Sequence, residues 1–224
     1  MLDLTTLQSR LIVSCQAYPG EPLRDPRTMA QMAQAAVNGG AAAVRIQGIR
    51  DLEQTRVAVD VPMIGLWKDG ADGVFITPTL EHALACAAAG SDIVAIDGTR
   101  RPRPDGRSLT DTIAALHEQT GVLVMADCGS AADAKAAADA GADLIGTTLA
   151  GYTGERDKTD GPDLKLITEI AALDLGVPLI AEGRIHTPGQ ARACLEAGAF
   201  AVVVGTAITH PTTITGWFAG ALRG

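Results

Sequence analysis

One pattern recurs along this chain: an alanine-rich helical stretch stops at glycine, and a short apolar stretch of strand character follows at once. Glycine commonly ends helices because it adopts positive φ without strain. The four junctions of this kind are Gly39-Gly40-Ala41, Gly90-Ser91-Asp92, Gly141-Ala142-Asp143 and Gly198-Ala199-Phe200. Four more apolar runs, two of them introduced by Val-Pro, occupy residues 11–15, 61–66, 122–126 and 177–181. The chain therefore contains eight predicted strands that alternate with helices.

This alternation favours one architecture. Strands are expected near residues 11–16, 42–46, 62–67, 93–97, 122–127, 143–147, 178–182 and 200–204. Helices are expected near residues 27–38, 50–58, 80–89, 109–119, 131–140, 163–173, 188–197 and 212–222. Strands that alternate with helices pair in parallel, and eight such units in 224 residues predict an α/β fold, a (β/α)8 TIM barrel formed by one domain over residues 1–224. A doubly wound open sheet is the alternative.

Composition limits the partners of the chain. Hydrophobic residues make up 47% and aromatic residues only 3%, so the core must be aliphatic. A net charge of -8 without a lysine cluster argues against nucleic-acid binding. No apolar run reaches the roughly 18 residues of a membrane span, and the N-terminus lacks a signal-peptide pattern. Four cysteines without a Cys-x-x-Cys pair and four histidines without metal-ligand spacing predict a reduced, cytoplasmic protein with no dedicated metal site.

Lys68 is the first candidate for catalysis. In a TIM barrel the chemistry lies at the carboxyl ends of the strands, and Lys68 is the only one of four lysines that directly continues an apolar strand. It shares a face with Ile64 and Leu66, which we take to be the barrel interior. A buried amine serves as a base or as a Schiff-base nucleophile. The alternative is a lysine that reaches solvent from a strand end.

Glu182 is the expected partner of Lys68, because this carboxylate ends a strand on the same face as Ile180 and precedes Gly183. It is interpreted as an acid-base or orienting group; the alternative is a structural ion pair with Arg184 or Arg45. A nearby glutamate raises a lysine pKa whereas burial lowers it, and the sequence leaves this balance open.

Three other strand ends carry polar side chains, namely Gln16, Arg45 and Asp127. We interpret Gln16 and Arg45 as groups that orient the substrate, and Asp127 as a group that binds sugar hydroxyls. Each has an alternative role, in which it closes the barrel mouth through hydrogen bonds. The tract at residues 100–104, Arg-Arg-Pro-Arg-Pro, is typical of a solvated basic loop, or of one that helps to hold an anion.

The last two strands both end at glycine, at Gly183 and at Gly205-Thr206. Glycine lets the backbone approach a ligand closely, so two such ends side by side predict a phosphate-binding cradle.

An ordered set of motifs carries a resemblance to a known family. LIVSCQA, AVRIQG, IGLWK, DGTRRPRP, GTTLAGYT, IAEGRI and AVVVGTAIT run through the chain from residue 11 to beyond residue 200. Together they resemble the N-acylglucosamine-6-phosphate 2-epimerase family, also called N-acetylmannosamine-6-phosphate 2-epimerase.

This resemblance implies a homodimeric barrel of the ribulose-phosphate-binding type that interconverts N-acetylmannosamine 6-phosphate and N-acetylglucosamine 6-phosphate in sialic acid or amino sugar breakdown. The implied site comprises Lys68 and Glu182 as catalytic residues, Gln16, Arg45, Asp127, Arg184 and His210 as substrate-binding residues, and Gly183, Gly205 and Thr206 as phosphate-binding residues. The family commonly has an arginine where His210 stands, and the segment 69–73 looks shorter than in typical members.

The implied chemistry is proton transfer at C2 of the open-chain sugar, whose aldehyde acidifies the C2 proton. Lys68 would move the proton, Glu182 would tune the lysine or handle hydroxyl and carbonyl protons, and Arg45 would stabilise the enolate. No cofactor is required. Two rival functions are a Schiff-base sugar-phosphate aldolase that uses Lys68 and a non-catalytic barrel that senses a phosphosugar.

Overall fold

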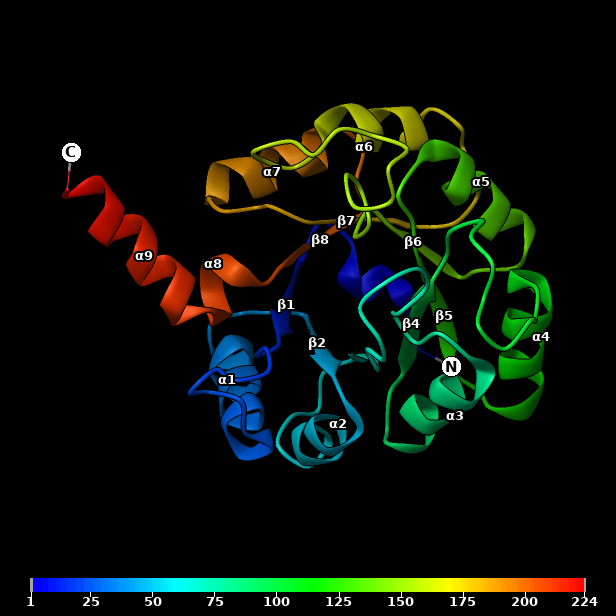
Figure 1. Ribbon diagram of the computed structural model, residues 1–224, viewed down its shortest axis with the longest axis horizontal. Helices are drawn as coiled ribbons and strands as arrows, with labels where there is room; N and C mark the ends of the chain where they lie inside the picture. Colours follow the sequence, from blue (N-terminus) through cyan, green and yellow to red (C-terminus); the bar gives the residue numbers. More distant parts are fainter. Residues whose placement is uncertain (1, 224) are drawn as a thin grey trace.

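Eight parallel strands close into a barrel in the computed structural model, which describes residues 2–223 (Figure 1). The strands are β1 (Leu11–Cys15), β2 (Ala43–Gln47), β3 (Met63–Leu66), β4 (Ile93–Asp97), β5 (Leu123–Asp127), β6 (Leu144–Gly146), β7 (Leu179–Glu182) and β8 (Ala201–Val204). Each strand pairs with its neighbours in the chain, and β8 closes on β1 with Leu11 opposite Val202. The predicted TIM barrel is confirmed, and the open-sheet alternative is wrong because the first and last strands are paired.

Helices surround the strands (Figure 1). They are α1 (Pro26–Asn38), α2 (Ile49–Arg56), α3 (Leu80–Ala88), α4 (Leu109–Gln119), α5 (Ala131–Asp139), α6 (Leu164–Ala171), α7 (Pro188–Glu196), α8 (Thr206–Thr209) and α9 (Pro211–Ala221). The predicted helices lie within two residues of these bounds. The four-residue α8 and a short 3-10 helix, η1 (Leu4–Leu7), were not expected, since neither is long enough to show helical periodicity.

Glycine conformations explain the helix-to-strand junctions. Gly40, Gly90, Gly141 and Gly198 follow α1, α3, α5 and α7, and all have φ between +96° and +106°. At Gly198 a Cβ atom would also lie 2.6 Å from the Cβ of Ala171, so the turn into β8 needs both the conformation and the small size of glycine. The chain therefore returns from each of these helices directly into the next strand.

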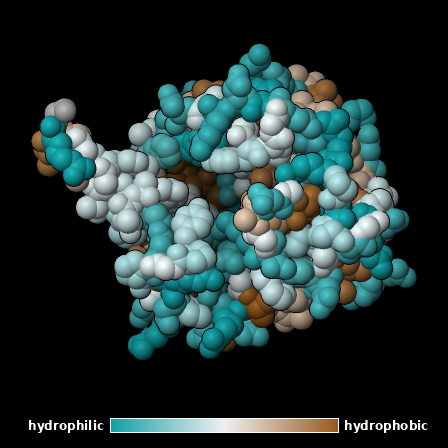
Figure 2. Space-filling model, viewed as in Figure 1, coloured by the Kyte–Doolittle hydropathy of each residue, from teal (hydrophilic) through white to brown (hydrophobic). Residues whose placement is uncertain are grey.

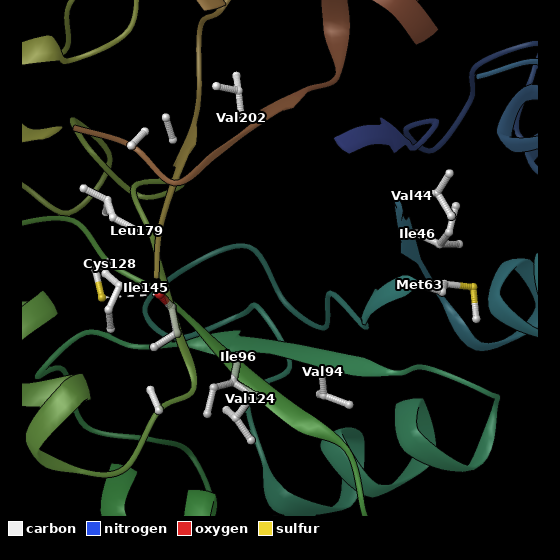
Figure 3. Close-up of a cluster of buried hydrophobic side chains, with 14 of the residues drawn as sticks. Val44, Ile46, Met63, Val94, Ile96, Val124, Cys128, Ile145, Leu179 and Val202 are labelled. Atoms are coloured by element: carbon white, nitrogen blue, oxygen red, sulfur yellow. Dashed lines mark hydrogen bonds between the residues drawn. The ribbon is translucent and has the colours of Figure 1, made fainter. Parts of the chain in front are cut away.

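The strands have two apolar faces. Side chains that point outward pack beneath the helices, and Figure 3 shows part of this layer with Val44, Met63, Ile96 and Val202 among the labelled residues. Side chains that point inward form a second cluster inside the barrel, which contains Ile64, Leu66 and Ile180. The face shared by Lys68 and Glu182 is therefore the barrel interior, because side chains alternate along a strand.

Helix α9 differs from the other long helices. It projects away from the barrel, at the left of Figures 1 and 2, and buries none of its side chains. Phe218 is 71% exposed, and Leu222 just beyond the helix is 88% exposed. The Trp217 ring packs back toward the barrel and lies 4.7 Å from the His186 ring, centroid to centroid. An apolar surface is thus left uncovered.

Within residues 2–223, none of the helices combines the length and the apolar character needed to cross a membrane.

Candidate active site

A cavity of about 540 Å³ opens at the carboxyl ends of the strands. Residues of β1, β2, β7, β8 and α8 line it, together with the segments that follow β1, β3, β6 and β7. Figure 2 shows a hollow near the middle of the molecule in this view. The position agrees with the expectation that chemistry in a barrel lies at this end of the strands.

Lys68 lies on the wall of this cavity. The residue continues β3 and is held there by an antiparallel bridge to Ile76, and its Nζ atom donates a hydrogen bond of 2.8 Å to Gln16 Oε1. Burial lowers the pKa of Lys68, the nearby Arg45 guanidinium lowers it further, and Glu182 opposes both. The net effect is a pKa below the ordinary value of lysine, which increases the fraction of neutral amine, the form that acts as a base. Trp67, the residue before it, faces outward, with its ring centroid 4.4 Å from that of His82.

Glu182 and Arg45 form a buried ion pair with an N–O distance of 3.0 Å. Arg45 is 1% exposed, and it also donates two hydrogen bonds, of 2.6 and 3.1 Å, to the fully buried carboxylate of Asp127. Thr148 joins the two acids, since its hydroxyl lies 2.7 Å from Asp127 Oδ1 and 3.1 Å from Glu182 Oε2. One guanidinium therefore serves two carboxylates.

This arrangement shifts the protonation of Glu182. Burial raises the pKa of Glu182 to about 7, Arg45 lowers it and Asp127 raises it. Burial alone would lower the pKa of Arg45, but the two carboxylates raise it above its ordinary value. A protonated fraction of Glu182 is thus present at neutral pH beside a permanent cation, which suits a group that exchanges protons with a ligand.

Lys68 and Glu182 lie across the cavity from each other, because β3 and β7 are four strands apart in a barrel of eight. No ion pair joins these two side chains. A small molecule held between them would meet an amine on one side and a carboxyl group on the other.

The ends of β7 and β8 supply backbone N–H groups to the same cavity. Gly183, Gly205 and Thr206 all line it, and among residues 2–223 the N–H groups of these three donate to no backbone acceptor. Gly183 has φ +113°, a conformation that glycine adopts without strain. Unpaired N–H groups at adjacent strand ends suit the binding of an anion.

Arg184 and His210 also line the cavity, but their side-chain nitrogens already interact with other groups of the protein. Arg184 donates to the carbonyl oxygens of Ala150 and Gly161 and to Thr159 Oγ1, so it ties the loop after β6 to the end of β7. His210 caps α9 through its Nδ1 atom, and its Nε2 atom contacts Glu21. Direct binding of substrate by these two residues stays a prediction.

Asp127 lies beneath the cavity and does not line it. Its oxygens accept hydrogen bonds from Arg45 and Thr148, so in this structure it holds Arg45 instead of facing a ligand. The arrangement matches the structural alternative weighed for this residue, in which hydrogen bonds close the barrel mouth.

The basic tract at residues 100–104 is exposed at Arg100, Pro102 and Pro104, but its arginine side chains are paired within the protein. Arg103 is 6% exposed and donates to the carbonyl oxygens of Asp97 and Thr77, while Arg101 pairs with Asp97. Arg100 pairs with Asp133 and Glu155. The tract fastens the loop after β4 to the barrel, and none of these arginines lines the described cavity.

Comparison with known proteins identifies the family. Residues 29–224 match the family model described as putative N-acetylmannosamine-6-phosphate epimerase. The chain belongs to this epimerase family. A relative from Cutibacterium acnes named putative N-acetylmannosamine-6-phosphate 2-epimerase is 61% identical over 221 residues, which are 98% of this chain and 96% of the relative. One from Corynebacterium glutamicum with the same name is 45% identical over 97% of this chain and 94% of its own length.

Solved structures agree with this assignment to the epimerase family. The N-acetylmannosamine-6-phosphate 2-epimerase from Clostridium perfringens superposes with a TM-score of 0.93 at 37% identity, covering 97% of this chain and 95% of that one. Thiamine phosphate pyrophosphorylase from Pyrococcus furiosus superposes with a TM-score of 0.60 at 17% identity, which shows a shared fold alone. The family predicted from the motifs is confirmed.

Several residues that line the cavity were missed by the sequence interpretation, among them Ser14, Tyr18, Thr148 and Tyr152. Ser14 and Thr148 carry a usable signal, because each is a polar residue at or just beyond the end of a strand. The two tyrosines are the only ones in the chain and both are more than half exposed, yet they lie in loops, where sequence gives no direction.

No metal site accompanies these residues. Across the described part of the chain, no group of three or more His, Cys, Asp or Glu side chains is placed to hold a metal ion.

Proposed function

We propose that this chain interconverts N-acetylmannosamine 6-phosphate and N-acetylglucosamine 6-phosphate by inverting the configuration at C2, in the breakdown of sialic acid or amino sugars. The proposal rests chiefly on one observation, the buried Lys68 amine that faces the Glu182 carboxyl group across a single cavity. Family membership and the substrate printed in the relatives' names support the choice of substrate.

We assign the phosphate of the substrate to the backbone N–H groups of Gly183, Gly205 and Thr206, which have no backbone acceptor in the described structure. Since these groups lie at β7 and β8, a sugar anchored there extends across the mouth toward β3. This brings its other end, with C1 and C2, to Lys68. His210 borders the same region and is the candidate for a further phosphate contact.

The reaction then moves protons at two atoms of the substrate, C2 and the carbonyl oxygen. The neutral amine of Lys68 takes the proton from C2 of the open-chain aldehyde, and protonated Glu182 gives a proton to the carbonyl oxygen as the enol forms. A half-turn of the planar enol about the C2–C3 bond presents the opposite face of C2 to the Lys68 ammonium, which returns its proton there. The enol hydroxyl gives its proton back to Glu182 as the carbonyl re-forms, so both residues recover their starting protonation states. Arg45 stabilises charge on the enolate and, with Asp127 behind it, keeps Glu182 in place. Gln16 holds the Lys68 amine. This sequence of steps uses no cofactor.

Proton NMR of N-acetylmannosamine 6-phosphate with the protein in deuterium oxide tests the proposal, because it reports epimerisation and deuterium incorporation at C2 together. Lys68→Met should abolish both, with a loss of at least about 10³-fold, as expected when the proton-transferring group is removed. A Lys68→Met variant that still exchanges the C2 proton would refute this role for the lysine.

Two further arms distinguish the rival functions. Borohydride added with substrate would trap a covalent adduct on Lys68 if the protein were a Schiff-base aldolase, and would trap none on an epimerase. A rise in melting temperature with phosphosugar but no turnover would indicate a sensing barrel.

We also propose that the protein is a homodimer and that it acts in the cytoplasm. The exposed apolar side chains of α9 support the first point, because a second copy of the chain would cover them. Four cysteines, all free and buried, support a reducing compartment.

A further inference from the structure

We propose that Ser14 is a positioning residue that keeps the Gln16 amide from rotating and thereby leaves the Lys68 amine free to act as a base. The inference rests on the proposed function, in that it assumes Lys68 takes a proton from the substrate. It concerns a side chain to which neither the sequence interpretation nor the family resemblance gives a role.

Ser14, Gln16 and Lys68 form a chain of two hydrogen bonds. The Gln16 side chain donates through Nε2 to Ser14 Oγ at 2.7 Å and accepts through Oε1 from Lys68 Nζ at 2.8 Å. Because side chains alternate along a strand, Ser14 and Gln16 share the inward side of β1 and its end. All three residues line the cavity.

The orientation of the Gln16 amide has a chemical cause. A lysine ammonium has three N–H donors and no acceptor, so its partner on Gln16 must be the carbonyl oxygen. The amide NH2 group then faces Ser14, whose hydroxyl oxygen accepts from it. The Lys68 ammonium therefore selects which end of the amide it meets, and the hydrogen bond to Ser14 anchors the amide in that orientation.

The orientation of the Gln16 amide matters most once Lys68 has lost its proton. A neutral amine has two N–H donors and one lone pair, and the lone pair must point at the C2 proton of the substrate. With the carbonyl oxygen of Gln16 beside it, the amine donates one N–H to Gln16 and keeps the lone pair free. With the amide reversed, an N–H of Gln16 would donate into the lone pair and occupy it. Ser14 keeps the amide in the first arrangement, which the ammonium form of Lys68 has selected, because rotation of the amide must first break the 2.7 Å hydrogen bond from Gln16 Nε2 to Ser14 Oγ.

Ser14 is itself held in place. Its carbonyl oxygen accepts a hydrogen bond of 2.7 Å from Thr209 Oγ1 in α8, and its side chain is 6% exposed. On the other side, Gly205 is so close that a Cβ atom on it would lie 3.3 Å from Ser14 Cβ. The same hydroxyl of Thr209 lies 3.1 Å from the Gly205 carbonyl oxygen. The residue that orients Gln16 is thus fixed to the strand end assigned to phosphate.

A double-mutant cycle tests this role. Ser14→Ala should lower kcat about tenfold, the effect of losing one oriented hydrogen bond worth about 1.4 kcal/mol, and should change KM by less than about twofold. Gln16→Glu replaces the amide with a group that cannot donate, so a reversed orientation no longer exists. When Ser14→Ala is added to Gln16→Glu, kcat should change by less than about twofold relative to Gln16→Glu alone. Both values of kcat are taken at high pH, where kcat no longer changes with pH. Ser14→Thr keeps the hydroxyl and should retain most of kcat.

Three results would overturn the inference. They are an unchanged kcat in Ser14→Ala, a rise in KM alone, which would make Ser14 a simple substrate contact, and an equal loss in both backgrounds, which would indicate a structural role. If Ser14→Ala melts at a much lower temperature than the parent protein, Ser14→Thr is used in its place. Because Ser14→Thr keeps the hydroxyl, a tenfold fall in the kcat of this variant would contradict the proposed role of Ser14. A wild-type protein without epimerase activity would refute the proposed function itself, which is a different outcome.

Discussion

At the scale of residues, the main feature is a guanidinium shared by two buried acids. Arg45 forms two hydrogen bonds with Asp127, of 2.6 and 3.1 Å, and an ion pair of 3.0 Å with Glu182. Asp127 is fully buried, and Glu182 is the acid that reaches the cavity. The geometry therefore separates the two carboxyl groups: Asp127 is the buried hydrogen-bond partner of Arg45, and Glu182 reaches the cavity with its pKa raised to about 7 by burial.

Glu182 should make stability depend on pH. Burial raises its pKa in the folded protein to about 7 from the ordinary 4.5, so between these values the folded state binds more protons than the unfolded state. The free energy of unfolding should then fall as pH rises through this window, by on the order of 2 kcal/mol. Urea unfolding at pH values on both sides of the window checks this. The fall should be absent in Glu182→Gln and kept in Glu118→Gln, which changes an exposed glutamate of α4.

Removing the shared cation should be costly. Arg45→Met would leave two buried carboxylates without their partner, and the free energy of unfolding should fall by about 3–5 kcal/mol. The double variant Arg45→Met with Asp127→Asn should recover part of this loss, since one of the two unpaired charges is gone. Arg192→Met breaks a pair whose members are 74% and 64% exposed and is the control, expected to cost less than about 1 kcal/mol. Equal losses at the two arginines, measured by urea unfolding, would contradict the burial argument.

Some of these residues were predictable and others were not. Period-two alternation was enough to put Lys68 on the same face as Leu66, and Glu182 on that of Ile180, because a strand has only two faces. The convergence of Thr148, Asp127 and Glu182 was not predictable, since those residues come from three different units of the barrel. The direct substrate role of Asp127 stays a prediction; in this structure its carboxylate accepts hydrogen bonds from Arg45 and Thr148.

At the scale of elements, glycine at the helix-to-strand junctions sets the spacing of the barrel. Gly198→Ala should lower the free energy of unfolding by about 2–3 kcal/mol, because the residue has φ +106° and its new Cβ would lie 2.6 Å from Ala171. Gly121→Ala is the matched control: this glycine also precedes a strand, but a Cβ there meets nothing within 4 Å. It should change stability by less than about 0.5 kcal/mol. Equal melting temperatures for the two variants would show that the junctions are not strained by a side chain.

Element boundaries followed from local signals. A helix was predicted near residues 188–197, and α7 begins at Pro188, where Thr187 caps it in a capping box with Gln190. Helix α8 escaped prediction because its four residues bury only Thr209 and have no apolar stripe. Its neighbour α9 was predicted from its sequence, but its direction away from the barrel depends on contacts that a sequence pattern does not encode.

At the scale of the whole molecule, the exposed helix α9 is the feature that bears on assembly. We expect the wild-type protein to be a dimer by light scattering, with Phe218 in the interface. Phe218→Asp should weaken the dimer at least about 30-fold, as expected for the loss of a buried aromatic contact worth 2 kcal/mol or more. Val57→Asp is the control, because this apolar residue is 84% exposed and lies after α2 on the barrel. A monomeric wild-type protein, or a dimer indifferent to Phe218→Asp, would contradict the proposal.

The barrel itself was predictable because eight repeats of one local event leave few topologies open. Each unit supplies a strand and the helix that follows it. Eight such units in a chain of this length therefore indicate that the sheet closes into a barrel. The shape of the cavity was beyond reach of the sequence, since loops after β1 and β6 supply Tyr18 and Tyr152 to its wall.

The chain's two tryptophans lie in different parts of the molecule, so each can serve as an intrinsic fluorescence probe of its own surroundings. Trp67 adjoins Lys68 and packs on His82, whereas Trp217 is carried by α9 and packs on His186. With Trp217→Phe, the remaining indole emission would follow ligand entry beside β3, and with Trp67→Phe it would follow the docking of α9. Catalysis and assembly are thus separately visible by intrinsic fluorescence, without an attached dye.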